Sequence, residues 1–301
     1  MLLKTLPTML CALLGVAFLT LLERKILSYL QNRKGPNKVG PMGLFQPFSD
    51  ALKLFMKELI LPFESNKSLF CVLPVISLSI GLLLWGLLPS TNSFAYPELS
   101  VLLFVCISSI NVYIVMGAGW TSNSVYAFLG SMRASAQTIS YEISLVFILL
   151  LPCLLVLSLD MCKFINAYPV VCLVILSAGL WMVTCLAETN RAPFDFAEGE
   201  SELVSGFNVE YGGGLFALLF LGEYAVILYM SMMTSACFIN VYNVYLYVMG
   251  GLWVAMSFLL IRGVFPRYRY DKLMNMCWKA ILPLSMSLLC VVFVARLLNE
   301  L

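Results

Sequence analysis

Long runs of apolar residues alternate with polar stretches along the whole chain. Eight of these runs are about 20 residues long, which is the length an α-helix needs to cross the hydrocarbon core of a membrane. They lie at about 2–22, 68–89, 99–120, 139–158, 168–187, 212–233, 241–261 and 277–298. Each is too long for a strand and lacks the alternation of a membrane barrel. The pattern therefore predicts an all-α polytopic membrane protein, 1–301 forming one transmembrane domain with about eight helices.

A shorter, amphipathic pattern follows Pro47 in the polar stretch after the first run. Its polar positions are three and four residues apart: Gln46, Ser49, Asp50, Lys53 and Lys57. The opposite stripe is Leu44, Phe48, Ala51, Leu52, Phe55 and Leu59. This spacing predicts a short amphipathic helix lying in the membrane interface. Two roles fit it: a plain surface anchor, or one wall of an entry site for a lipid-like ligand.

The basic residues gather in alternate polar stretches. Fifteen of the 18 Lys and Arg residues lie in or directly beside four charged loops, at about 23–67, 121–138, 188–211 and 262–276. The other three are Lys4, Lys163 and Arg296. Loops rich in Lys and Arg stay on the inner side of a membrane. All four loops are therefore expected to face the cytoplasm or the mitochondrial matrix, with the N terminus on the other side.

Composition excludes several classes of protein. The chain is 61% hydrophobic and 11% charged, with a mean hydropathy of +0.94, so it is not a soluble single-core enzyme. It contains no histidine, which removes the commonest general base and metal ligand. No two cysteines are closer than nine residues, so metal or iron–sulfur spacing is absent and no metal site is expected. A net charge of +2 gives no reason to expect a nucleic-acid partner.

The loop 188–211 is acidic and at the same time rich in apolar residues. Its acids are Glu188, Asp195, Glu198, Glu200, Glu202 and Glu210, against the single Arg191. Pro193 suits a helix start, and on such a helix Asp195, Glu198 and Glu202 would share a face. Like charges this close disfavour joint ionisation, so the cluster could bind and release protons. The alternative is a plain solvated acidic loop, and the pattern leaves both open.

Three further ionisable residues lie in or against the apolar runs: Glu142, Glu223 and Arg262. A charge at the bilayer centre costs roughly 2.5–3.5 kcal/mol on insertion scales, so it normally faces protein or water. Glu142 and Arg133 would point to opposite sides of one helix, and each is expected to find a partner on another helix. Two classes of protein fit these features: a subunit of an ion-translocating redox complex with a lipophilic substrate, or a secondary transporter. The absence of an internal repeat between the two halves favours the first.

Four blocks of the sequence resemble the subunit 1 family of NADH–ubiquinone oxidoreductase, respiratory complex I. They are LERKILSYLQNRKGPNKVGPMG at 22–43, RASAQTISYE at 133–142, AETNRAPFDFAEGESELVSGFNVEYGGG at 187–214 and RGVFPRYRYDKLMNMCWK at 262–279. Their order and spacing match that family along the whole chain. The third block is long and specific.

The resemblance implies a core membrane subunit of the mitochondrial inner membrane, multi-pass, with the N terminus on the intermembrane-space side. Such a subunit forms much of the ubiquinone access chamber and couples quinone reduction to proton translocation. The family's quinone-chamber positions fall on Arg24, Phe220, Tyr224 and Arg262. Its acidic relay falls on Glu142, Glu188, Asp195, Glu198, Glu200, Glu202, Glu210 and Glu223.

The same resemblance implies how the chemistry is shared among subunits. Ubiquinone would be the substrate, and this chain would bind no cofactor and have no activity alone, because FMN and the iron–sulfur clusters belong to partner subunits. Its partners would be peripheral-arm and neighbouring membrane-arm subunits of complex I, together with membrane lipids. The alternative is the membrane subunit of a related hydrogenase-type complex, which would lack a quinone tunnel.

Overall fold

Helices run side by side through most of the chain in the computed structural model, which describes residues 2–89, 97–165, 169–196, 206–239 and 243–300. Seven helical segments are long and apolar enough to cross a membrane, judged by length and composition. Their helices are α1 (Leu2–Leu30), α3 (Lys67–Trp85), α4 (Ser100–Thr121), α5 (Val125–Val156), α10 (Gly213–Thr234), α11 (Val244–Val264) and α13 (Leu282–Glu300). The predicted all-α, multi-pass membrane architecture is confirmed.

The one predicted span that is not among these seven, 168–187, is shorter and interrupted. It forms α7 (Val170–Leu173) and α8 (Ile175–Glu188), which meet at Val174 with φ −140° and ψ 78°. At 1.5 Å per residue the 14 residues of α8 reach about 21 Å, less than the roughly 30 Å of a hydrocarbon core. The apolar run predicts the position of this element but not its break, because a β-branched residue such as Val174 lowers helix propensity only slightly.

Other helices extend beyond their predicted bounds. α5 begins at Val125, so most of the predicted 121–138 loop is helical. Arg133 was taken as a loop residue, but a single charge does not end a helix whose small residues Ala127, Gly130 and Ala134 are buried against its neighbours. α13 is likewise preceded by α12 (Tyr270–Met276) and the π-helical turn η4 (Cys277–Ile281), which continue it backwards through Lys272 and Lys279.

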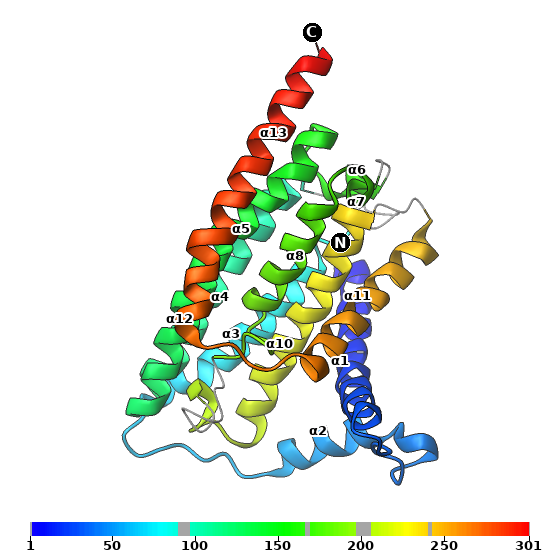
Figure 1. Ribbon diagram of the computed structural model, residues 1–301. Helices are drawn as coiled ribbons and strands as arrows, with labels where there is room; N and C mark the ends of the chain where they lie inside the picture. The colour runs from blue at the N-terminus through cyan, green and yellow to red at the C-terminus, as the bar shows by residue number, and fades with distance from the viewer. Residues whose placement is uncertain (1, 90–96, 166–168, 197–205, 240–242, 301) are drawn as a thin grey trace.

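The remaining elements are short. The predicted amphipathic helix is α2 (Gln46–Met56), which lies across the lower end of the bundle in Figure 1 and exposes Phe48, Leu52 and Phe55. It follows the turn η1 (Pro41–Gly43). α6 (Met161–Ile165), η2 (Gly206–Asn208) and the π-helical turn η3 (Ser235–Ile239) complete the described elements.

The charged loops meet at one end of the bundle. The N–H of Asn66 donates to the carbonyl of Thr121 over 3.0 Å, and the N–H of Tyr268 donates to the carbonyl of Pro193 over 3.1 Å. These bonds join the 23–67 stretch to the α4–α5 turn, and the 262–269 stretch to the turn after α8. The described parts of the loops thus meet in two pairs. That all four loops face the same side of the membrane, the matrix, stays a prediction.

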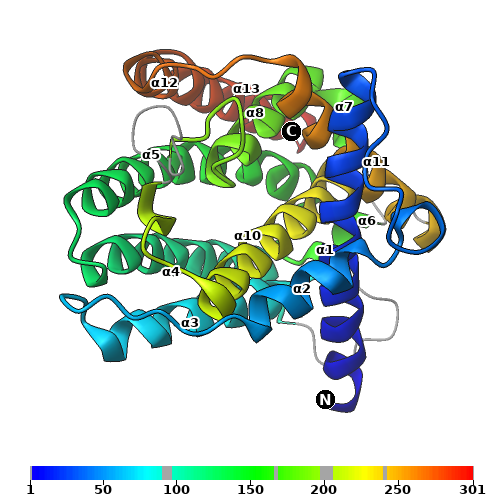
Figure 2. The same cartoon turned by 90° about the horizontal axis from the view of Figure 1, so that it is seen from below.

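α10 lies at the centre of the bundle, between α3 and α1 (Figure 2). Its close approach to α3 depends on glycine, because a Cβ added at Gly222 would come within 3.1 Å of the Ser77 backbone. The indole N–H of Trp85 on α3 also donates to the carbonyl of Ala225 over 3.1 Å. Of the neighbouring polar residues of α10, Tyr224 is buried and Glu223 is half-buried.

Candidate functional site

Glu23 is a buried carboxylate near the C-terminal end of α1. Only 4% of the residue is exposed, although Arg24 beside it points outward. The Tyr224 hydroxyl donates to one carboxylate oxygen over 2.6 Å. The other oxygen pairs with Arg191 at 3.1 Å and with Arg262. We call these four residues the Glu23 cluster.

The members of the Glu23 cluster come from four separate segments. Arg191 lies in the turn after α8, Tyr224 at the middle of α10 and Arg262 in the last turn of α11. The Arg191 guanidinium stacks over the Tyr224 ring at 4.1 Å from the ring centre. The cluster therefore fixes the C-terminal ends of α1, α8 and α11 against α10.

Two guanidiniums of the Glu23 cluster face one carboxylate oxygen. The side chains of Arg191 and Arg262 are 16% and 31% exposed, so neither guanidinium is sealed from its surroundings. Two partly exposed guanidiniums with a tyrosine hydroxyl beside them suit a small ligand that carries, or acquires, negative charge.

The Glu23 cluster borders a narrow cavity of about 10 Å³. Its other walls are apolar, formed by Leu19, Ile227, Phe258 and Leu259. The Phe220 ring continues this surface, with its centre 6.2 Å from that of Tyr224. The cluster thus places polar groups against an apolar wall, a combination that suits a mostly apolar ligand with a polar head.

The predicted quinone-chamber residues divide between two places. Tyr224 and Arg262 belong to the Glu23 cluster, and Phe220 stacks beside it. Arg24 lies apart: it pairs with Asp50 of α2 at 2.6 Å, and its side chain is 53% exposed. Consecutive residues of a helix point about 100° apart, so Glu23 and Arg24 face different surroundings.

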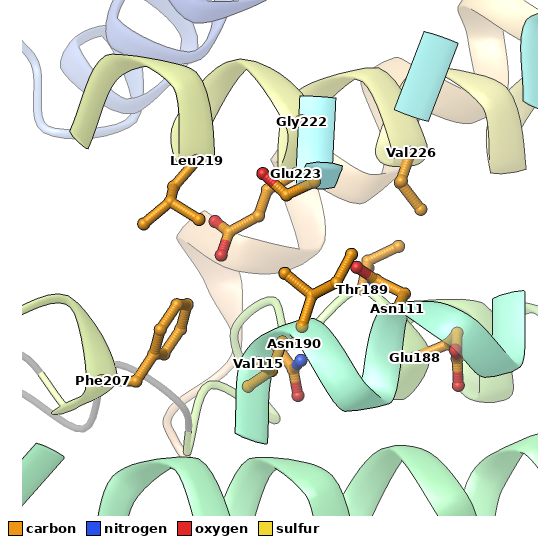
Figure 3. Close-up of a pocket in the computed structure, with 12 residues that line it drawn as sticks. Asn111, Val115, Glu188, Thr189, Asn190, Phe207, Leu219, Gly222, Glu223 and Val226 are labelled. Atoms are coloured by element: carbon orange, nitrogen blue, oxygen red, sulfur yellow. The ribbon is translucent and has the colours of Figure 1, made fainter. Parts of the chain in front are cut away.

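A second polar site lies between α4, α10 and the end of α8. Its cavity of about 40 Å³ has room for about three water molecules. Figure 3 shows Glu223 reaching into it from α10, with Asn111, Thr189 and Asn190 on the opposite side. Glu188 also lines this cavity. Glu223 and Tyr224 are adjacent on α10, so this helix contributes a residue both to the acidic cavity and to the Glu23 cluster.

Two acidic residues in or beside this cavity, Glu188 and Glu142, lie within the helix bundle. Glu188 is 6% exposed, and its Oε2 atom accepts no hydrogen bond from the described residues. Glu142 of α5 interacts electrostatically with Glu188 and accepts a hydrogen bond from Ser108 of α4 over 3.4 Å. The expected partner of Glu142 on another helix is therefore Ser108. Glu188 therefore connects Glu142, with which it interacts, to Glu223, with which it lines one cavity.

The acidic loop is only partly described. Asp195 is buried and pairs with Arg267 at 3.3 Å, whereas Glu210 is half-buried. Residues 193–196 form turns, so the helix expected from Pro193 does not begin there. Instead the N–H of Phe194 donates back to the carbonyl of Arg191 over 2.8 Å. Glu198, Glu200 and Glu202 lie outside the described residues, as does the helical face that they were expected to share with Asp195.

The aromatic side chains around this loop are packed rather than solvated. The rings of Phe70 and Tyr211 stack with their centres 4.0 Å apart, and Phe207 is buried beside them. Burial raises the pKa of the Tyr211 hydroxyl, which shares a hydrogen bond of 3.4 Å with Thr121. The described part of the loop is thus an interior segment. Within the described residues no group of three Cys, Asp or Glu side chains is placed to hold a metal ion.

Sequence reasoning missed Glu23 and Arg191 as members of a site. Glu23 follows an apolar run directly, so it was taken as the end of a span, and Arg191 was counted only as a loop cation. One signal pointed to Glu23: Leu19 lies four residues before it on the helix, on the same buried face. Nothing in the sequence places Arg191, because its partners lie 168 and 33 residues away along the chain.

Comparison with known proteins places these residues in a family context. A model of the family described as NADH dehydrogenase matches residues 3–293. The chain is 50% identical over 293 residues to the NADH-ubiquinone oxidoreductase chain 1 of Aedes aegypti, covering 96% of this chain and 93% of that protein. It is 53% identical to the protein of that name from Artemia franciscana, covering 92% and 93%. For the one from Balaenoptera physalus the identity is 49%, covering 92% and 90%.

Proposed function

The chain belongs to the NADH dehydrogenase family, and from that premise we propose that it is the membrane subunit 1 of NADH–ubiquinone oxidoreductase and forms the inner part of its ubiquinone chamber. The observation that carries the proposal is the Glu23 cluster. A buried carboxylate there holds two arginines and a tyrosine beside a small cavity whose other walls are apolar. That plan fits a lipophilic molecule with a polar, reducible headgroup.

Quinone reduction explains why two guanidiniums suit this place. The headgroup takes up two electrons and two protons, so negative charge develops on its oxygens before the protons arrive. Arg191 and Arg262 would stabilise that charge, and Glu23 holds both guanidiniums in position. The Tyr224 hydroxyl, already donating to Glu23, supplies a polar group on the same wall. The apolar residues Leu19, Ile227, Phe258 and Phe220 would contact the isoprenoid tail.

The acidic cavity gives this chamber a route for proton coupling. Glu223 lines the cavity and is adjacent to Tyr224, and Glu188 precedes Arg191 by three residues. A change of charge at the headgroup would therefore alter the proton affinity of the carboxylates that line this cavity. The proposed path runs through Glu223, Glu188 and Glu142 towards neighbouring membrane subunits, with Asp195, Glu198, Glu200, Glu202 and Glu210 forming its acidic approach. In this way a local charge would be read out at a distance.

The rest of the redox chemistry is assigned to partner subunits. We propose that FMN and iron–sulfur clusters lie on the peripheral arm, which would close the chamber against the end of the bundle where the charged loops meet. The complex would lie in the mitochondrial inner membrane, with that end in the matrix. The related hydrogenase-type subunit remains the second candidate, and quinone reductase activity of the purified complex separates the two.

Replacing Arg262 tests the proposal. In the assembled complex, Arg262→Gln should lower kcat/KM for a short-chain ubiquinone about tenfold, because one of two charges facing the headgroup is lost. Arg269→Gln is the matched control, since the side chain of Arg269 is 78% exposed and pairs with the exposed Asp271 at 3.0 Å. Flavin content measures assembly. Equal quinone kinetics in both variants at equal flavin content would refute the proposed chamber.

A further inference from the structure

Gln137 is a fully buried polar residue of α5, inside the block RASAQTISYE, that the proposed function leaves without a role. Its side-chain amide nitrogen donates two hydrogen bonds to backbone carbonyls. One goes to Ala187 over 2.8 Å and the other to Phe194 over 2.9 Å. The acceptors lie 50 and 57 residues further along the chain, so these bonds join α5 to a distant segment.

The orientation of this amide is fixed by its surroundings. Turning the amide over would place its oxygen against two carbonyl oxygens, which repel it, so only the nitrogen can face them. The oxygen Oε1 is buried and has no hydrogen-bond partner among the described residues. An unsatisfied buried acceptor is destabilising. The arrangement thus favours the two donated bonds over full satisfaction of the side chain.

The two acceptors bracket the turn that carries the functional residues. Ala187 lies in the last turn of α8, and its carbonyl also accepts from the N–H of Asn190 over 3.3 Å. Phe194 closes the turn, its own N–H donating to the carbonyl of Arg191 over 2.8 Å. Between them lie Glu188, which lines the acidic cavity, and Arg191, which pairs with Glu23. A single amide group therefore holds both ends of the segment that links the two sites.

The neighbouring face of α5 supports the same segment. Tyr141 follows Gln137 by four residues, so both side chains lie on one side of the helix. The Tyr141 ring stacks against Phe194 with the ring centres 6.5 Å apart, and its hydroxyl donates to the carbonyl of Leu273 over 3.2 Å. Tyr141 packs against the turn and Gln137 bonds to it. The polar anchor of the turn to α5 is thus the Gln137 amide.

We infer that Gln137 is a positioning residue, which holds the 187–194 turn so that Arg191 faces the quinone headgroup while Glu188 faces the acidic cavity. The inference rests on the proposed function, because it assigns Gln137 a part in linking the same two sites. Gln137 touches neither substrate nor proton path itself. Its effect on quinone binding and on proton coupling would pass through the backbone of the turn.

The test compares Gln137→Met with Thr138→Val in the assembled complex. Methionine has a similar length but no donor. Thr138 is the matched neighbour, because its buried hydroxyl bonds to the carbonyls of Ala134 and Ser135 on its own helix. Per flavin, Gln137→Met should lower kcat/KM for a short-chain ubiquinone about tenfold, chiefly through a higher KM, because a misplaced Arg191 weakens its contact with the bound headgroup in the ground state as well as in the transition state. It should also lower the number of protons pumped per electron, whereas Thr138→Val should change neither.

A milder variant keeps the test decisive if Gln137→Met does not assemble. Gln137→Asn retains the amide but is one methylene shorter, so it can reach at most one carbonyl. As with Gln137→Met, KM should rise and the number of protons pumped per electron should fall. A purely structural role would lower the amount of complex and leave both quantities unchanged, and that result would overturn the inference. Arg262→Gln separates the two ideas. If it impairs quinone kinetics while the Gln137 variants match Thr138→Val, the positioning role alone is rejected; if it does not, the quinone chamber is rejected.

Discussion

Replacing Glu23 by glutamine removes the negative charge at the centre of the Glu23 cluster and little else. The amide oxygen can still accept from the Tyr224 hydroxyl, and the side chain keeps its length. What is lost is the counter-charge of Arg191 and Arg262, whose guanidiniums both face the same carboxylate oxygen. The amide nitrogen, a donor, would then compete for that position. We therefore expect both arginines to leave their present geometry.

The size of the effect follows from burial. Removing one partner of a buried ion pair typically costs about 3–5 kcal/mol. The carboxylate is 5% exposed, but the guanidiniums are 16% and 31% exposed, so water can recover part of that loss for the arginines. About 2 kcal/mol of that cost to stability remains. If the displaced arginines lose a similar free energy of contact with the headgroup in the transition state, kcat/KM for quinone falls about 30-fold.

Steady-state kinetics of the purified complex with a short-chain ubiquinone measure this fall. Flavin content normalises for assembly, and NADH oxidation by a water-soluble acceptor reports on the partner subunits alone. Glu64→Gln is the control, since Glu64 is an exposed carboxylate outside the helices. If Glu23→Gln assembles and its kcat/KM stays within about twofold of the Glu64→Gln value, the reasoning from burial and charge is wrong.

Two further predictions concern packing and the second ion pair. Gly222→Val should destabilise the complex by about 1–3 kcal/mol, because the added Cβ would meet Ser77 backbone atoms at 3.1 Å. Gly179→Val should have no such effect, since a Cβ there meets no atom within 4 Å. Equal melting temperatures of the two variants would contradict the close α3–α10 contact. Asp195→Asn should destabilise the complex by about 1–2 kcal/mol, because Asp195 is buried against Arg267. Asp271→Asn, in an exposed pair, should change the melting temperature hardly at all, and a larger shift for Asp271→Asn would reverse this ranking.

The helices were largely predictable because membrane insertion imposes a simple rule on the sequence. A span must be apolar over about 20 residues, and the seven long helices obey it. The same rule failed at helix ends. The charge pattern places Arg133 and Lys272 in loops, yet both lie within helical backbone, where a long side chain can reach polar surroundings without ending the helix.

The site was predictable in type rather than in membership. Intramembrane charge identified Glu223, Glu142 and Arg262, because such residues are costly unless they face protein or water. The pairing of Arg191 with Glu23 was not predictable, since it depends on how α1, α8 and α11 pack on α10. Arg24 illustrates the converse. It is adjacent to Glu23 in the sequence, yet it bonds to Asp50 on a different face of α1.

Photoaffinity labelling with a short-chain quinone analogue tests most directly whether this chain forms the ubiquinone chamber. The complex is illuminated with the labelled analogue, digested and mapped by mass spectrometry, with and without excess ubiquinone. The account predicts label, displaced by ubiquinone, on peptides that contain Glu23, Tyr224 or Arg262, and no displaceable label at the opposite end of the bundle around Glu98 and Asp160. Displaceable label confined to partner subunits, or to that opposite end, would contradict it.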